Sequence, residues 1–256
     1  MKNILLTAIT AVICGSTLLN AEDVTKLRVG LADNAPKTLA PQPVAIPQIP
    51  ALAAGKRKDA VDDWYVINVP VQFVGTAPSS KEKNAWVTDV TLRIHLRAEG
   101  KDGKSVHLTK TLALSDVPLR SGSGDKGSYK GSYNIGIFLP QRSYEMIAGS
   151  EKGKIKVFAY AVEAAFNGEV CKRPKDSVVE THDSSVKLKP TWYKRSKSKA
   201  SSAKVYAISE TPFAPYYGAA YPRPNPIYGA PVVDESVFDK GDEAGDGASE
   251  SSDAES

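Results

Sequence analysis

Two stretches of regular alternation between apolar and polar residues set the fold class of this chain. From Trp86 to Arg97 a mostly apolar series at even positions alternates with a mostly polar series at odd positions, and residues 106–114 largely repeat the pattern. Successive side chains of a strand point to opposite faces, so each stretch predicts a strand with one buried side. The polar residues 100–103 between them predict an antiparallel hairpin. Both apolar sets carry even numbers, so opposed residues share parity and the loop is longer than two residues.

Similar alternation predicts more strands elsewhere in the chain. It occurs at residues 62–73, 129–139 and 155–162, with weaker signals at 178–179, 186–193 and 205–211. Residues 141–148 predict two helical turns that end before Gly149. Long amphipathic helices are lacking. About seven or eight strands in this arrangement predict an all-β fold, an antiparallel immunoglobulin-like β-sandwich.

The strand at residues 155–162 is apolar on both sides, which predicts a central position in its sheet. The Asn167-Gly168 pair predicts a turn after it. Glu163 is the exception, because its number places it with Ala161 on the side expected to face the core. Residues 115–126 are rich in glycine and serine and predict a loop.

The first 21 residues have the features of a secretory signal peptide. Lys2 precedes an apolar stretch at residues 4–13, and small and polar residues lead to Ala21. Polar residues interrupt this stretch, whereas a membrane span needs about 20 apolar residues. We expect cleavage after Ala21 and export to the periplasm, the outer membrane, the cell surface or the medium, without a membrane span.

Proline-rich segments flank the predicted sandwich. We expect an extended proline- and alanine-rich arm at residues 22–60, the sandwich at residues 61–210 and a proline- and tyrosine-rich strap at residues 211–233. The strap is either a docking peptide for a partner or a cover for an edge of the protein's own sheet. Its candidate docking aromatics are Phe213, Tyr216, Tyr217, Tyr221 and Tyr228.

Charge is spread unevenly around a net value of +4. Residues 234–256 carry nine acidic residues and one lysine, and we expect this tail to be disordered. Basic residues gather in residues 172–204. Export argues against nucleic acid as their partner and favours anionic glycans, surface polymers or the acidic tail, with a solvated lysine-rich surface as the alternative. The candidate polyanion-binding residues are Lys187, Lys189, Lys194, Arg195, Lys197 and Lys199.

The sequence contains no recognisable catalytic signature. Its histidines are His95, His107 and His182, without the spacing of a metal motif. His95 and His107 share the outward face of the hairpin, opposite or diagonal to each other, and we interpret them as an exposed pair, because two ligands alone make a weak metal site. Cys171 is the only cysteine after the signal, and we expect it to be a buried apolar group. We predict no enzyme activity, no catalytic residue, no cofactor and no metal.

The layout of signal, proline-rich arm, sandwich, tyrosine- and proline-rich strap and acidic tail resembles a known family. These are exported immunoglobulin-like proteins of the type IV pilus-associated gene cluster of verrucomicrobial gut bacteria, with a fold compared with archaeal pilins. The signal departs from that of true pilins, because position 20 is Asn where a prepilin-type site has Glu. The resemblance implies a non-enzymatic structural, assembly or adhesion protein at the cell surface, with pilus-cluster proteins or copies of itself as partners.

Two alternatives stay open: a module that binds anionic glycans or surface polymers, and an unrecognised hydrolase. For the pilus interpretation, we hypothesise that the arm joins neighbouring molecules by strand addition. Removing residues 22–55 would then leave the sandwich folded and abolish association. The inserting side chains would be Val24, Leu27, Val29 and Leu31.

Overall fold

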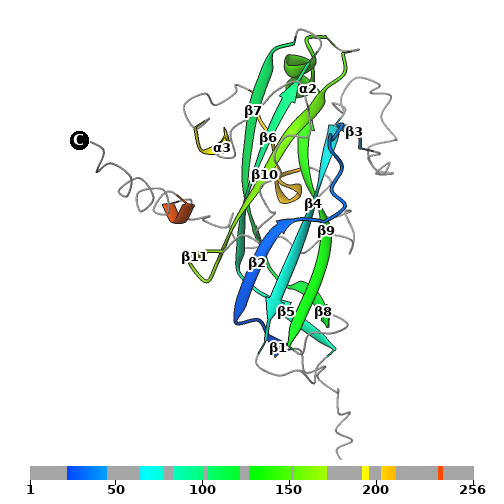
Figure 1. Cartoon of the computed structure of the whole chain (residues 1–256). Coiled ribbons are helices and arrows are strands. Elements are labelled where there is room, and N and C mark those ends of the chain that lie inside the picture. Colours follow the sequence, from blue (N-terminus) through cyan, green and yellow to red (C-terminus); the bar gives the residue numbers. More distant parts are fainter. Residues whose placement is uncertain are drawn as a thin grey trace, which may run out of the picture.

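The computed structural model describes residues 22–44, 64–77, 83–100, 103–121, 127–150, 153–171, 192–195, 203–211 and 236–238. Two β-sheets pack face to face (Figure 1), which confirms the predicted all-β sandwich. All strand pairs are antiparallel except the short β1–β5 pair. Eight strands in the described part of the chain have four or more residues.

The larger sheet, called sheet A, has the order β1-β5-β8-β9-β4-β2, and β3 also pairs with β4. Its strands are β1 (Glu22–Asp23), β2 (Lys26–Leu31), β3 (Gln42–Pro43), β4 (Trp64–Thr76), β5 (Asn84–Val87), β8 (Val117–Ser121) and β9 (Ser128–Pro140). The smaller sheet, called sheet B, has the order β11-β10-β6-β7. Its strands are β6 (Val90–Glu99), β7 (Ser105–Leu114), β10 (Lys156–Phe166) and β11 (Glu169–Val170).

The hairpin of β6 and β7 has the predicted register. Leu96 lies opposite Leu108 and Glu99 opposite Ser105, so opposed numbers share parity and the connection between the strands is longer than two residues. The prediction of one unbroken strand from Trp86 is wrong, because the chain passes from sheet A to sheet B between β5 and β6. Asp89 and Asp116 adopt left-handed conformations at φ 55° and 53°. Aspartate tolerates this region better than most residues, so both strands turn the same corner.

This corner changes which residues face the core. Ala85 and Val87 are buried in β5, whereas Trp86 is 38% exposed, contrary to the side we expected for it. Beyond the corner the even-numbered residues of β6 face inward. The loop expected at residues 115–126 is also corrected, because residues 117–121 form β8 and pair with β5. The hairpin therefore belongs to both sheets and joins them along one side.

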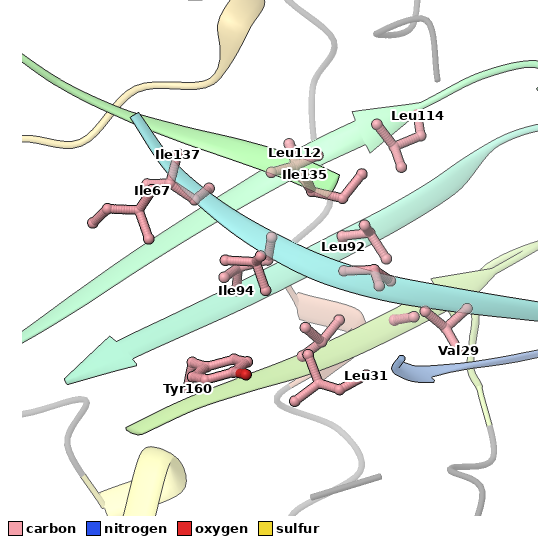
Figure 2. Close-up of a cluster of buried hydrophobic side chains, with 14 of the residues drawn as sticks. Val29, Leu31, Ile67, Leu92, Ile94, Leu112, Leu114, Ile135, Ile137 and Tyr160 are labelled. Carbon is pink, nitrogen blue, oxygen red and sulfur yellow. The ribbon is translucent and has the colours of Figure 1, made fainter. Parts of the chain in front are cut away.

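Apolar side chains from both sheets fill the space between them. Figure 2 shows Ile67 of β4 and Ile137 of β9 near Ile94 of β6, all at most 1% exposed. Tyr160 of β10 lies in the same layer and donates a hydrogen bond to the carbonyl of Pro36. At about 0.8 kcal/mol for each buried CH₂, this layer supplies most of the driving force for folding.

The N-terminal segment is part of the sandwich, which corrects the expected extended arm and the domain boundary at residue 61. Strand β2 pairs with β4 from Lys26–Thr76 to Leu31–Val71. Leu39 then bridges to Val157 of sheet B, and β3 returns to β4. The side chains proposed to insert into a neighbour are instead buried in the protein's own core: Val24, Leu27, Val29 and Leu31.

Short segments complete the described structure. Helix α2 (Gln141–Ala148) ends at Gly149 with φ 75°, and Asn167-Gly168 turns β10 into β11, both as predicted. Helix α3 (Trp192–Arg195) replaces the end of the strand expected there. Tyr206 bridges to Phe138 of β9, and the 3₁₀ helix η2 (Ile208–Glu210) follows.

The acidic tail is ordered at one point, which corrects its prediction as disordered throughout. Residues 236–238 are helical, and Phe238 is buried. Among the described helices, none is long and apolar enough to cross a membrane.

Candidate functional site

The candidate site lies on the outer face of sheet B, the face turned away from sheet A. Three charged or polar side chains are buried there, Arg93, His95 and Glu163, at 5%, 2% and 8% exposure. Burial of such groups carries a high cost unless they have partners. A polar cluster at this depth is therefore the feature of the described fold that core packing does not explain.

Glu163 reaches this face because β10 contains a bulge. The register with β6 shifts between Val157 and Ala159, so two successive residues lie on the outer side. Beyond the bulge Tyr160 and Val162 pack in the main core, whereas Ala161 belongs to a separate outer cluster. The expectation that Ala161 and Glu163 face inward is thus wrong. The prediction that β10 is buried on both of its faces is confirmed. Within sheet B, however, the edge strand β11 pairs with only two residues of β10.

His95 connects Glu163 to the edge of the sheet. Its Nε2 lies 2.9 Å from Oε2 of Glu163. Because a carboxylate accepts a hydrogen bond, this contact places a proton on Nε2 of a neutral His95 and leaves Nδ1 as the acceptor. The cluster therefore has a defined tautomer at its centre.

His107 and Thr109 complete the cluster on the neighbouring strand β7. His95 lies directly opposite Thr109 and diagonal to His107, as the diagonal alternative predicted. Nδ1 of His95 is 3.3 Å from Nε2 of His107, and Oγ1 of Thr109 is 3.3 Å from each of these nitrogens. The three atoms form a triangle with equal sides. His95 itself is buried, so the pair is not exposed in the way we expected.

Aromatic side chains from distant parts of the chain cover this face. The Tyr193 ring lies 5.2 Å from the His95 ring, and the Trp192 ring meets the His107 ring edge-on at 5.5 Å. Figure 1 shows α3, which carries both aromatics, beside the strands of sheet B. Phe238 contacts the Arg93 guanidinium at 4.5 Å. Aromatic contacts of this kind stabilise an imidazole or guanidinium while limiting its access to water.

The chemistry available here is that of two imidazoles, one hydroxyl and one carboxylate. His95 contacts His107, Glu163 and Thr109, and of these three only the Thr109 hydroxyl is a potential nucleophile. Within the described ranges no group of three or more His, Cys, Asp and Glu side chains is arranged to hold a metal ion. Thr109 was not counted among the candidates in the sequence, since a threonine in a strand carries no signal of its own.

A second feature is a groove beside β7, on the side where no described strand pairs with it. Its volume is about 450 Å³, and Thr109, Thr111 and residues 203–206 line it. Lys110 and Glu210 form an ion pair across it at 2.6 Å. Glu210 also accepts a hydrogen bond from the Ala207 amide. The lining is about half polar and half apolar and is open to solvent, so the groove lacks the enclosed apolar surface of a small-molecule site.

Cys171 is confirmed as a buried apolar group in the core. Burial raises the pKa of its thiol to about 12, so the nucleophilic thiolate is scarce at neutral pH. Burial likewise raises the pKa of the Tyr160 hydroxyl to about 12. Neither group has the lowered pKa that a reactive nucleophile needs.

Other residues singled out in the sequence lie outside what the structure describes. His182 and all five candidate docking aromatics fall in undescribed segments, and so do Lys187, Lys189, Lys197 and Lys199. Lys194 and Arg195 belong to α3, but only their backbone is described. The polyanion-binding surface and the docking strap therefore stay predictions.

Comparison with known proteins places the chain in a family. A protein-family model matches residues 37–226, more than half of the sequence. The chain belongs to that family. The matched range includes the β6–β7 hairpin, Glu163 and both aromatics of α3. None of the curated proteins matches the chain.

Among solved structures, one similar fold is a crystal structure of a protein from the verrucomicrobial gut bacterium Akkermansia muciniphila. The two sequences are 17% identical, and the TM-score is 0.47. The alignment covers 79% of this chain and 95% of the other.

Proposed function

We propose that this protein is a non-enzymatic structural or assembly component on the outside of the cell, associated with type IV pili. The observation that carries the proposal is a β-sandwich that fills the edge of its larger sheet with its own N-terminal segment. Strand β2 and the two residues of β3 cover β4 along much of its length. The edge of sheet A is therefore the six-residue β2 instead of the thirteen-residue β4, and a shorter edge strand reduces uncontrolled pairing with other chains outside the cell.

The sequence preceding this segment supports export. The secretory signal predicted at residues 1–21 ends immediately before β1 (Glu22–Asp23). Cleavage after Ala21 would therefore free the first strand to pair with β5. The layout that resembles pilus-associated proteins and the match to a family model over residues 37–226 support the same assignment.

The chemistry of the described residues supports a non-enzymatic role. Cys171 lies in the core with a raised pKa, and the buried His95 contacts a carboxylate and a second imidazole rather than a hydroxyl nucleophile poised for attack. Thr109 approaches His95, but its hydroxyl is shared with His107. A hydrolytic site needs a nucleophile and base aimed at one substrate position, so this arrangement favours binding or architecture over hydrolysis.

Cell fractionation tests the location. In a producing cell, an antibody against the purified sandwich should detect the protein in the periplasmic, outer-membrane or surface fraction. Mass spectrometry of that material should find Glu22 as the first residue. An intact Met1 on protein confined to the cytoplasm would contradict the proposal at its first step.

Shearing tests the association with pili. Appendages sheared from the surface should carry the protein in immunogold images, and a strain without pilus assembly should lose this labelling while total protein stays constant. Equal labelling of cells with and without pili would support the surface location and contradict the association with pili. Turnover of a substrate panel by the purified protein would overturn the non-enzymatic assignment.

A further inference from the structure

We propose that His95, His107 and Thr109 form a binding site for a divalent transition-metal ion of the zinc class on the outer face of sheet B, oriented by Glu163. The sequence argues against a metal here, because it offers two imidazoles without a motif. The structure adds a third donor and a carboxylate behind the first imidazole. Neither addition follows from the spacing of the histidines.

The distances among the three donor atoms fit a metal ion. Nδ1 of His95, Nε2 of His107 and Oγ1 of Thr109 are mutually 3.3 Å apart. The centre of a triangle with these sides lies about 1.9 Å from each corner, which is 3.3 Å divided by √3. Zinc binds histidine nitrogen at about 2.0–2.1 Å. An ion slightly out of the plane would contact all three atoms without rearrangement of the strands.

Glu163 gives His95 the protonation that a metal ligand needs. Its carboxylate accepts the proton on Nε2 at 2.9 Å, so the lone pair of Nδ1 points toward the triangle. A carboxylate bound to the remote nitrogen of a metal-binding histidine fixes the ring and raises its basicity. In the metal-free cluster, Nε2 of His107 can donate its proton to Nδ1 of His95. Metal binding would move that proton to Nδ1 of His107, with no net loss of protons.

The surroundings suit a cation with an incomplete shell. Thr109 is exposed, so the triangle opens to solvent on one side and water can fill the remaining positions. Arg97 lies opposite His107, but its guanidinium donates to Ser105, on the side of His107 away from Thr109. Arg93 is directed to Phe238. The Glu163 carboxylate lies 2.9 Å from Nε2 of His95 and contributes a negative charge close to the site.

The aromatic cover restricts the two imidazoles to the geometry of the site. Trp192 meets the His107 ring edge-on, and Tyr193 lies tilted at 39° against His95. The rings therefore arrive at the triangle already oriented, which lowers the entropy cost of binding. Imidazole donors with a neutral oxygen favour Zn²⁺, Cu²⁺ or Ni²⁺ over Mg²⁺ and Ca²⁺.

Calorimetric titration of the untagged mature protein with Zn²⁺ at pH 7.5 tests the site. We expect saturable binding of one ion and a rise in the melting temperature, because the ion binds the folded state. His107→Ala should abolish both effects. Glu163→Gln should weaken binding about 10–100-fold, as loss of the hydrogen-bond partner behind a metal-binding histidine does in other sites. His182→Ala is the matched control and should bind like the unmodified protein.

Circular dichroism confirms that each variant is folded before titration. If His107→Ala does not fold, Thr109→Val decides, because it keeps the branched shape suited to a strand and removes the oxygen. Mg²⁺ in place of Zn²⁺ should give no saturable binding. The proposal is overturned by an absence of saturable Zn²⁺ binding, by unchanged affinity in folded His107→Ala or Thr109→Val, or by loss of binding in His182→Ala.

Discussion

Most residues on both faces of strand β6 are buried, but the two faces are buried by different chemistry. Its inner face carries Leu92, Ile94 and Leu96, which pack against sheet A. Its outer face carries Arg93, His95 and Arg97, whose aromatic neighbours are Phe238, Tyr193 and Phe158, respectively. The inner face obtains its free energy from area removed from water, whereas the outer face depends on matched polar contacts.

This difference separates stability from chemistry within one strand. Apolar packing tolerates small changes in shape, because each contact is weak and non-directional. A buried carboxylate and imidazole pair tolerates little, because loss of one partner leaves the other desolvated and unsatisfied. The outer face is therefore the part of the sandwich where a substitution changes chemistry more than fold.

Removal of the N-terminal segment should have the largest effect, because it opens the inner layer. Deleting residues 22–44 removes five buried valine and leucine side chains, each worth about 1.5–3 kcal/mol. Their sum approaches the whole net stability of a domain, about 5–15 kcal/mol. We expect loss of the cooperative thermal transition in calorimetry. Deletion of residues 240–256, the predicted disordered end, is the control and should leave the transition unchanged. If the protein without residues 22–44 folds with normal stability, the N-terminal segment is a separable arm after all and the account is contradicted.

A truncation in the middle of the inner face should come next. Ile94 is fully buried between the sheets, so Ile94→Ala leaves a cavity and should lower the free energy of unfolding by about 2–5 kcal/mol. Ile94→Val removes one methylene and should cost about 0.5–1.5 kcal/mol. Urea denaturation measures both. Equal and small effects would mean that the layer is loosely packed.

The aromatic cover should contribute less than the inner layer. Trp192 is buried against His107, and Trp192→Ala should reduce the free energy of unfolding by about 2 kcal/mol, the value for burial of one large side chain. Trp86 offers a matched comparison, because it is 38% exposed in β5. Trp86→Ala should have clearly the smaller effect in the same denaturation experiment. A larger loss of stability for Trp86→Ala than for Trp192→Ala would mean that α3 does not pack against the histidines.

Removal of the ion pair at the groove should have the smallest effect on the free energy of unfolding. Lys110 and Glu210 meet at 2.6 Å, but Glu210 is about half exposed. Glu210→Gln keeps an oxygen for the Ala207 amide and removes only the charge. We expect a loss of about 0.2–1 kcal/mol that shrinks in 1 M salt. A larger, salt-independent loss would show that this pair is as protected as the outer cluster.

The sequence predicted the hairpin well, because its information is local. Alternation and parity determined how Leu96 faces Leu108, and Asn167-Gly168 with Gly149 marked a turn and a helix end. It failed at the corner, where Asp89 and Asp116 turn two strands into the other sheet. One aspartate in a strand-like stretch carries no distinct signal. The two act together only once the strands are paired.

Much of the candidate site was beyond prediction for a similar reason. The bulge near Val157 reverses which side Glu163 takes, and alternation alone cannot reveal a one-residue shift. The cover by Trp192 and Phe238 joins residues about one hundred positions or more from β6. Alternation predicts that His95 and Arg93 face away from the core. It does not predict that other parts of the chain bury these two side chains.

A double-mutant cycle on His95 and Glu163 tests most directly whether the outer face is a buried polar layer. The free energy of unfolding would be measured for His95→Gln, Glu163→Gln, the double variant and the unmodified protein. A hydrogen bond with a charged partner at 2.9 Å in this environment predicts a coupling energy of about 1.5–3 kcal/mol. Additive effects, with a coupling energy below about 0.5 kcal/mol, would mean that water separates the two groups and would contradict the account.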